Sequence, residues 1–82
     1  MAATRQDIDG WIKQAIKDKM KFIISVCDTW DYEDYPVYCK DEKELKTEYA
    51  HYDGGENMQM VNEIIKIEND KVTEGLSIYN IN

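Results

Sequence analysis

The sequence predicts a small α+β domain with two helices on one face of a three-stranded sheet. Three observations support this fold class: an apolar stripe at helical spacing near the N-terminus, short apolar runs of strand length, and a second helical stretch behind a capping residue. The 82 residues suffice for one domain, and a hydrophobic content of 43% argues against disorder. We therefore expect the order α-β-β-α-β within a single domain, 1–82.

The first predicted helix extends from about Arg5 to Lys19. Thr4 and Asp7 form a capping pair, because the hydroxyl and the carboxylate can bind the first free amides of a helix. Behind them, apolar residues recur at i, i+3, i+4, i+7 and i+8, which is one helical stripe: Ile8, Trp11, Ile12, Ala15 and Ile16.

Two strands follow the first helix. Residues 22–27 form a continuous apolar run that predicts a strand buried on both faces. The acidic residues of 28–34 interrupt the hydrophobicity and predict a loop, and residues 35–39 alternate again as a second strand. Pro36 cannot donate to a strand ladder, so this second strand is expected at an edge of the sheet.

The second predicted helix lies between residues 40 and 52. Asp41 is a good N-cap with Glu44 in the capping-box position, and Gly54-Gly55 is expected to end the helix. Residues 58–67 fit both helical and strand spacing, and the alternation of the isoleucines favours a strand.

The tail, residues 69–82, is expected to form a turn with at most one helical turn before Gly75. Its apolar side chains would then lie on the sheet or pack in a dimer: Leu76, Ile78 and Ile81.

The topology follows from these elements. The first two strands form an antiparallel hairpin, and the crossover helix brings the third strand parallel to the second through a right-handed connection. With the second strand at an edge, the strand order is 2-1-3, and both helices are expected on one face.

The negative charge is concentrated in the middle of the chain. The net charge of the protein is −7; residues 1–27 sum to +2, residues 28–56 to −7 and residues 57–82 to −2. This sign disfavours direct contact with nucleic acid or with a membrane surface. It would attract a basic partner or a metal ion, or it simply keeps a small protein soluble.

The sequence offers little support for catalysis. The single histidine, His51, has no nucleophile at a recognisable spacing, and no phosphate-binding glycine loop or Cys/His cluster is present. We therefore expect a protein that is not an enzyme and needs no cofactor or structural metal. A metal-dependent hydrolase that uses Asp28, Asp31 and Asp34 remains an alternative, although their spacing does not match the calcium-loop pattern.

Aromatic residues alternate with acids over residues 28–38, the predicted loop and most of the strand after it. Trp and Tyr are the residues that anchor protein interfaces, and an acidic rim steers a basic partner. In the alternative interpretation, Trp30 and Tyr35 close a hydrophobic corner over the sheet end. The first interpretation predicts a partner-binding set that continues onto the second helix: Trp30, Asp31, Tyr32, Glu33, Asp34, Tyr35, Glu42, Glu44 and Glu48.

Two segments resemble a family of small bacteriophage proteins. They are Val-Cys-Asp-Thr-Trp-Asp-Tyr-Glu-Asp-Tyr-Pro-Val-Tyr at 26–38 and Tyr-Asp-Gly-Gly-Glu-Asn-Met-Gln-Met-Val at 52–61, and the likeness covers roughly residues 4–67. The resemblance implies an inhibitor that binds a host protein, for example a nucleic-acid-handling defence complex, as anti-CRISPR proteins do. It also implies the cytoplasm of the host bacterium, which agrees with two expected free thiols and with the lack of an apolar secretion signal.

An alternative function is a sponge, an oligomer that sequesters a nucleotide signal at a subunit interface. Such a protein needs a cationic pocket, and the sequence offers one cluster on or near the first helix: Arg5, Lys13, Lys17, Lys19 and Lys21.

Overall fold

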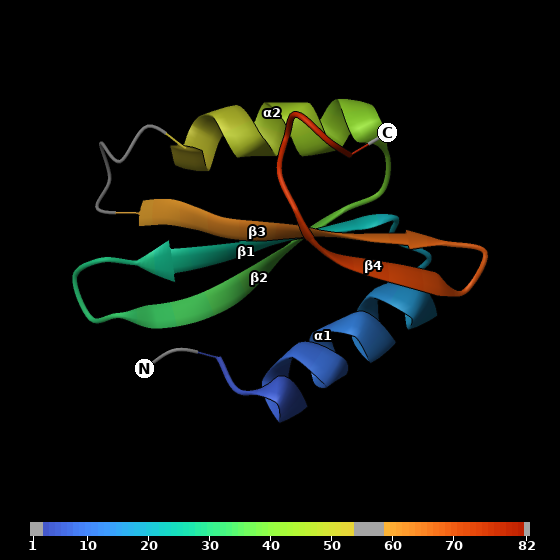
Figure 1. Cartoon of the computed structure of the whole chain (residues 1–82), viewed down its shortest axis with the longest axis horizontal. Helices are drawn as coiled ribbons and strands as arrows, with labels where there is room; N and C mark the ends of the chain where they lie inside the picture. The colour runs from blue at the N-terminus through green and yellow to red at the C-terminus, as the bar shows by residue number, and fades with distance from the viewer. Residues whose placement is uncertain (1–2, 54–58, 82) are drawn as a thin grey trace.

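A central sheet separates two layers of apolar side chains, and one helix packs on each layer (Figure 1). The computed structural model describes residues 3–53 and 59–81. Within these ranges it contains two helices and four strands: α1 (Arg5–Lys17), β1 (Phe22–Asp28), β2 (Glu33–Cys39), α2 (Glu42–Asp53), β3 (Gln59–Glu68) and β4 (Lys71–Leu76).

The strand order is β2-β1-β3-β4, and all neighbouring strands are antiparallel. Because β2 and β3 both run opposite to β1, they are parallel to each other, as expected for the second and third strands. Pro36 lies on the outer strand β2, where the lack of an N–H is tolerated. The central strand β1 is the apolar run of the sequence.

The prediction that both helices cover one face is wrong. On one face, Leu45 of α2 belongs to a buried cluster with Phe22 and Ile24, and on the other face Ile12 of α1 belongs to a cluster with Ile23. Figure 1 shows α2 and α1 on opposite sides of the sheet. Successive residues of a strand point to opposite faces, so an unbroken apolar run needs a cover on each side.

The prediction of three strands is also wrong, because the tail contributes β4. The two residues of the β3–β4 turn, Asn69 and Asp70, have φ values of 50° and 66°. Positive φ at both central residues is the geometry of a two-residue hairpin turn that matches the twist of the strands. Gly75, with φ of 71°, lies in β4 where the pairing register with β3 shifts.

The N-terminal end of α1 is as predicted. The Thr4 hydroxyl accepts a hydrogen bond from the Asp7 N–H (3.1 Å), and the Asp7 carboxylate accepts one from the Thr4 N–H (3.0 Å). This is a complete capping box.

The C-terminal end of α1 comes two residues earlier than predicted, at Lys17 rather than Lys19. Lys19 has a φ of 59°, and its N–H donates to the carbonyl of Ile16 while that of Met20 donates to Ala15. These two bonds are the Schellman arrangement that closes a helix.

The N-cap of α2 is confirmed: the Asp41 carboxylate accepts a hydrogen bond from the Glu44 N–H at 2.8 Å. The Glu44 carboxylate reaches back to the N–H of Lys40 (3.1 Å) rather than to Asp41. The expected helix end at Gly54-Gly55 lies outside the described residues.

The β1–β2 hairpin is tighter than the predicted loop 28–34 allows, because β2 already begins at Glu33. Cys27 therefore lies opposite Asp34, and Cys39 lies opposite Phe22, at the other end of the ladder. Both thiols are free, as expected.

The C-terminal segment packs against the α2 side of the sheet. Leu76 and Ile78 contact the buried cluster there, and Ile81 belongs to it with 3% of its surface exposed. The Lys66 ammonium donates a hydrogen bond to the Ile81 carbonyl at 3.2 Å. Of the two interpretations of the apolar tail, packing on the sheet is confirmed.

In the described part of the chain, neither helix has the length and apolar character needed to cross a membrane.

Candidate functional site

The β1–β2 turn, residues 29–32, projects two aromatic side chains from one end of the sheet. The Trp30 residue is 75% exposed and Tyr32 is 69% exposed. The sequence left open whether Trp30 closes a hydrophobic corner; the exposure excludes that arrangement. Trp and Tyr are enriched among the residues that anchor protein interfaces.

Two aspartates form hydrogen bonds within this turn. The Asp28 carboxylate accepts from the Trp30 N–H at 2.9 Å, and the Asp31 carboxylate accepts from the Glu33 N–H at 3.1 Å. Asp side chains commonly bind a backbone N–H two residues on in this way. Asp28 and Asp31 thus stabilise the local backbone of the hairpin.

The backbone of the turn is also closed by itself. The Tyr32 N–H donates to the Asp28 carbonyl at 2.7 Å, and Tyr32 adopts a φ of 58°, in the left-handed region. An aromatic residue rarely adopts this conformation, since its Cβ crowds the following carbonyl. The closed turn presents the Trp30 and Tyr32 side chains outside the sheet.

Asp34 and Tyr35, the next two predicted site residues, are half-buried. The Asp34 carboxylate accepts a hydrogen bond from the Ala3 N–H at 2.9 Å and lies opposite Cys27. Burial raises the pKa of the Cys27 thiol, and its hydrogen bond with Asp34 raises it further. Both interactions keep Asp34 within the sheet surface.

Tyr35 belongs to the α2 face of the sheet. Its ring contacts Tyr52 of α2 edge-to-face at 6.3 Å between centroids, and its hydroxyl accepts a hydrogen bond from the Gln59 amide. Burial raises the pKa of the Tyr35 hydroxyl, with smaller contributions from the Tyr52 hydroxyl and from Asp28. Tyr35 therefore belongs to the strand ladder and to the α2 side of the sheet rather than to the exposed turn.

The three glutamates predicted as flanking charge do not surround the turn. Glu42 and Glu44 are in the first turn of α2, at the end of the molecule opposite the β1–β2 turn (Figure 1). Strand β2, which joins the two ends, is about 20 Å long at the usual rise per residue. Glu42 pairs with Lys46 at 3.6 Å, and Glu48 is half-buried on the same helix.

Met60 is a candidate site residue that sequence reasoning missed. It is 50% exposed and lies opposite Cys27, one position from the end of β1. Three of the five large hydrophobic residues that are exposed in the described ranges, Trp30, Tyr32 and Met60, thus gather at one end of the sheet. A strand pattern gives no signal for this exposure, because it depends on which part of the sheet α1 covers.

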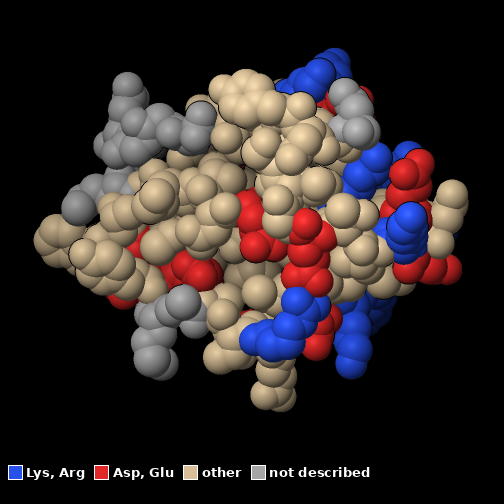
Figure 2. Space-filling model, in the orientation of Figure 1, with Lys and Arg blue, Asp and Glu red and all other residues tan. Residues whose placement is uncertain are grey.

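The hairpin that carries the turn has one sign of charge. Residues 22–39 include four acids and no Lys or Arg: Asp28, Asp31, Glu33 and Asp34. In Figure 2, the blue side chains lie away from the end with the β1–β2 turn, mostly near the β3–β4 turn. The exposed rings therefore belong to a hairpin with a net negative charge, which would attract a basic partner.

The same acids do not assemble a metal centre. Within the described ranges, no three His, Cys, Asp or Glu side chains lie together as metal ligands. Asp28, Asp31 and Asp34 accordingly do not form the ligand set that the hydrolase alternative requires.

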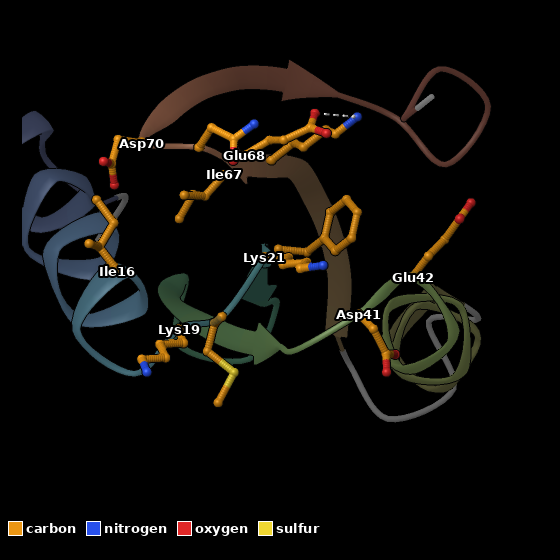
Figure 3. A pocket seen from close by; sticks show the side chains of 12 residues that line it. Ile16, Lys19, Lys21, Asp41, Glu42, Ile67, Glu68 and Asp70 are labelled. Carbon is orange, nitrogen blue, oxygen red and sulfur yellow. Dashed lines mark ion pairs between the residues drawn. The ribbon is translucent and has the colours of Figure 1, made fainter.

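A second feature is a groove of about 520 Å³ where the end of α1, the start of α2 and the β3–β4 turn meet (Figure 3). Lys21 lies across its middle, and Asp41 and Glu42 stand on one side. The lining combines apolar residues with three lysines and four acids: Ile16, Lys19, Met20, Lys21, Phe22, Asp41, Glu42, Lys66, Ile67, Glu68, Asn69 and Asp70.

The charges of this groove do not favour the nucleotide sponge. Lys66 is paired with Glu68 at 3.5 Å, the ion pair dashed in Figure 3. Only Lys19 and Lys21 of the predicted cationic cluster reach the groove. Arg5 is held elsewhere by Asp9 and Glu74, each at 2.7 Å. Four carboxylates would repel a phosphate there.

In comparisons with known proteins, no protein-family model matches this chain, and no curated protein or solved structure matches it either.

Proposed function

We propose that this protein binds a host protein with a basic surface through the β1–β2 turn and thereby inhibits it. The observation that carries this proposal is the joint exposure of Trp30 and Tyr32 on a hairpin that contains four acids and no base. Aromatic anchors provide most of the affinity at protein interfaces, and complementary charge provides steering and specificity.

The resemblance to small phage proteins supports a bacterial host protein as the partner. A nucleic-acid-handling defence complex suits the charge, because carboxylates can occupy a basic channel where phosphates would otherwise lie. Binding there needs no catalysis by this chain, and it would take place in the host cytoplasm.

Affinity capture tests this proposal. The wild-type protein is used as bait in nuclease-treated bacterial lysate at low and moderate salt, beside a Trp30→Ala/Tyr32→Ala variant. We expect one stoichiometric protein on the wild type, less of it at higher salt, and none on the variant. Purified partner is then assayed for activity with and without this protein, and inhibition is the expected result.

Tyr79 offers a matched control, because it is 95% exposed and lies in the C-terminal segment. Tyr79→Ala removes an exposed aromatic ring outside the turn and should retain the same partner as the wild type. Equal capture by the wild type and by the Trp30/Tyr32 variant would contradict the proposal.

A further inference from the structure

The acids in and beside the β1–β2 turn differ in what their carboxylates contact. Those of Asp28 and Asp31 accept backbone hydrogen bonds inside the turn, whereas Glu33 is exposed at the start of β2. A carboxylate that already binds its own backbone is poorly placed to bind a partner. The two aspartates and the two aromatic rings therefore have separate tasks.

The turn is closed by its own hydrogen bonds, without any partner. Three hydrogen bonds close it: Asp28 carbonyl to Tyr32 N–H, Asp28 carboxylate to Trp30 N–H, and Asp31 carboxylate to Glu33 N–H. In the strand that follows, Tyr35 packs on Tyr52 of α2. A turn that is already ordered in the free protein loses little conformational entropy on binding. It therefore binds more tightly than a mobile turn with the same contacts.

We propose that this turn is a preformed plug: Trp30 and Tyr32 enter an apolar cavity of a protein partner, while Asp28 and Asp31 hold the turn in shape. Lys or Arg side chains at the rim of that cavity face Glu33 and the negative hairpin. This inference rests on the proposed function for its partner. The positioning role of the aspartates belongs to the free protein.

The charge of the hairpin favours a protein partner over a membrane surface. Exposed Trp and Tyr would also suit a membrane interface, but the four acids and absent bases of residues 22–39 oppose an anionic lipid surface. The same charge complements a basic rim. Met60, exposed beside the turn, extends the apolar contact onto β3.

The first experiment compares two double variants of the free protein. Asp28→Asn/Asp31→Asn removes both charges and keeps both side-chain acceptors, since Asn makes the same turn bonds. Asp28→Ala/Asp31→Ala removes both. We expect ¹⁵N relaxation to show wild-type order at Trp30 and Glu33 in the Asn variant and fast motion in the Ala variant. Equal order in all three proteins would overturn the positioning role.

The second experiment measures affinity and rates for the purified partner found by capture. Trp30→Ala and Tyr32→Ala should each weaken binding about 30-fold or more, mainly through faster dissociation. The Asn variant should retain affinity within a few-fold, whereas the Ala variant should lose about tenfold. If Asn and Ala weaken binding equally, the carboxylates contact the partner directly and the plug is wrong while the proposed function stands.

If circular dichroism shows that the double Ala variant does not fold, single Asp31→Ala takes its place in both experiments.

Two further outcomes test the partner that we propose. Phosphatidylcholine vesicles that shift the Trp30 resonance in 5-fluorotryptophan-labelled protein would assign the rings to a membrane and overturn the plug. Capture that retains no specific protein would defeat the proposed function and the cavity, but not the positioning role, which the relaxation data decide.

Discussion

Lys19, like Tyr32, adopts a backbone conformation that few residues with a Cβ adopt. It closes α1 in the left-handed region, with a φ of 59°, where glycine avoids the crowding that any Cβ meets. Lys19→Gly should therefore raise the free energy of unfolding by about 0.5–1 kcal/mol, measured by urea denaturation. Lys13→Gly, in the middle of α1, should lower it by about 1 kcal/mol. If both substitutions lowered the free energy of unfolding, the backbone of Lys19 would not be strained.

Cys39 couples stability to alkaline pH. Burial, and then the nearby carboxylates of Glu44, Glu48 and Asp41, raise the pKa of its thiol from 9.0 to about 12. Between these values the unfolded chain has lost the thiol proton and the folded protein retains it. The free energy of unfolding should therefore fall as pH rises from 9 towards 12, by at most about 1.4 kcal/mol per pH unit for this proton.

The measurement is urea denaturation at several pH values for wild type and Cys39→Ala. The cavity lowers the stability of the variant at every pH. The test is the slope, which should be shallower in the variant, while Tyr35 and Tyr38 titrate in both proteins. Parallel slopes would show that Cys39 does not contribute.

At the scale of the element, α1 depends on its N-terminal cap. Thr4→Ala removes the hydroxyl that accepts the Asp7 N–H and should cost about 1 kcal/mol of unfolding free energy. Thr47 is a matched control on α2, because its hydroxyl donates only to the preceding turn, to the carbonyl of Lys43. Thr47→Ala should change stability by less than 0.5 kcal/mol, as roughly expected for an exposed site; equal losses would argue against the cap.

Elements with strong local signals could be predicted from the sequence. The capping residues Thr4 and Asp41 locate the starts of both helices, and the apolar run 22–27 locates β1. β4 could not be found in this way. The exposed residues of Lys71–Leu76 outnumber its half-buried ones, and the bulge at Gly75 breaks the alternation that marks a strand.

The candidate site was only partly predictable for a related reason. The sequence shows the acids and aromatics of 28–35, but Trp30 and Tyr35 look alike in it. Their difference arises because β2 begins at Glu33, which leaves Trp30 in the turn and Tyr35 in the ladder under Tyr52. Hairpin register depends on the turn that forms. The glutamates of α2 were wrongly predicted to flank the turn, because the chain first runs the length of β2 and begins α2 at the other end of the sheet.

For the whole molecule, the C-terminal segment is part of the core. Ile81 is buried beside α2 and its carbonyl binds Lys66, so Ile81→Ala should lower the free energy of unfolding by about 2–4 kcal/mol. Tyr79→Ala, two residues away and exposed, should change it by less than about 0.5 kcal/mol. Thermal denaturation of both variants measures the difference. A mild effect at Ile81 would mean that the core closes without this segment.

The two outer strands also determine whether copies of the molecule can aggregate through the edges of their sheets. Sheets with long, regular edges recruit the strands of neighbouring copies and grow into fibrils. Here Pro36 removes one donor from β2, and the register shift at Gly75 distorts β4. Neither border offers an uninterrupted template for another chain. Both outer strands therefore have a feature that opposes amyloid-like stacking of one copy on the next.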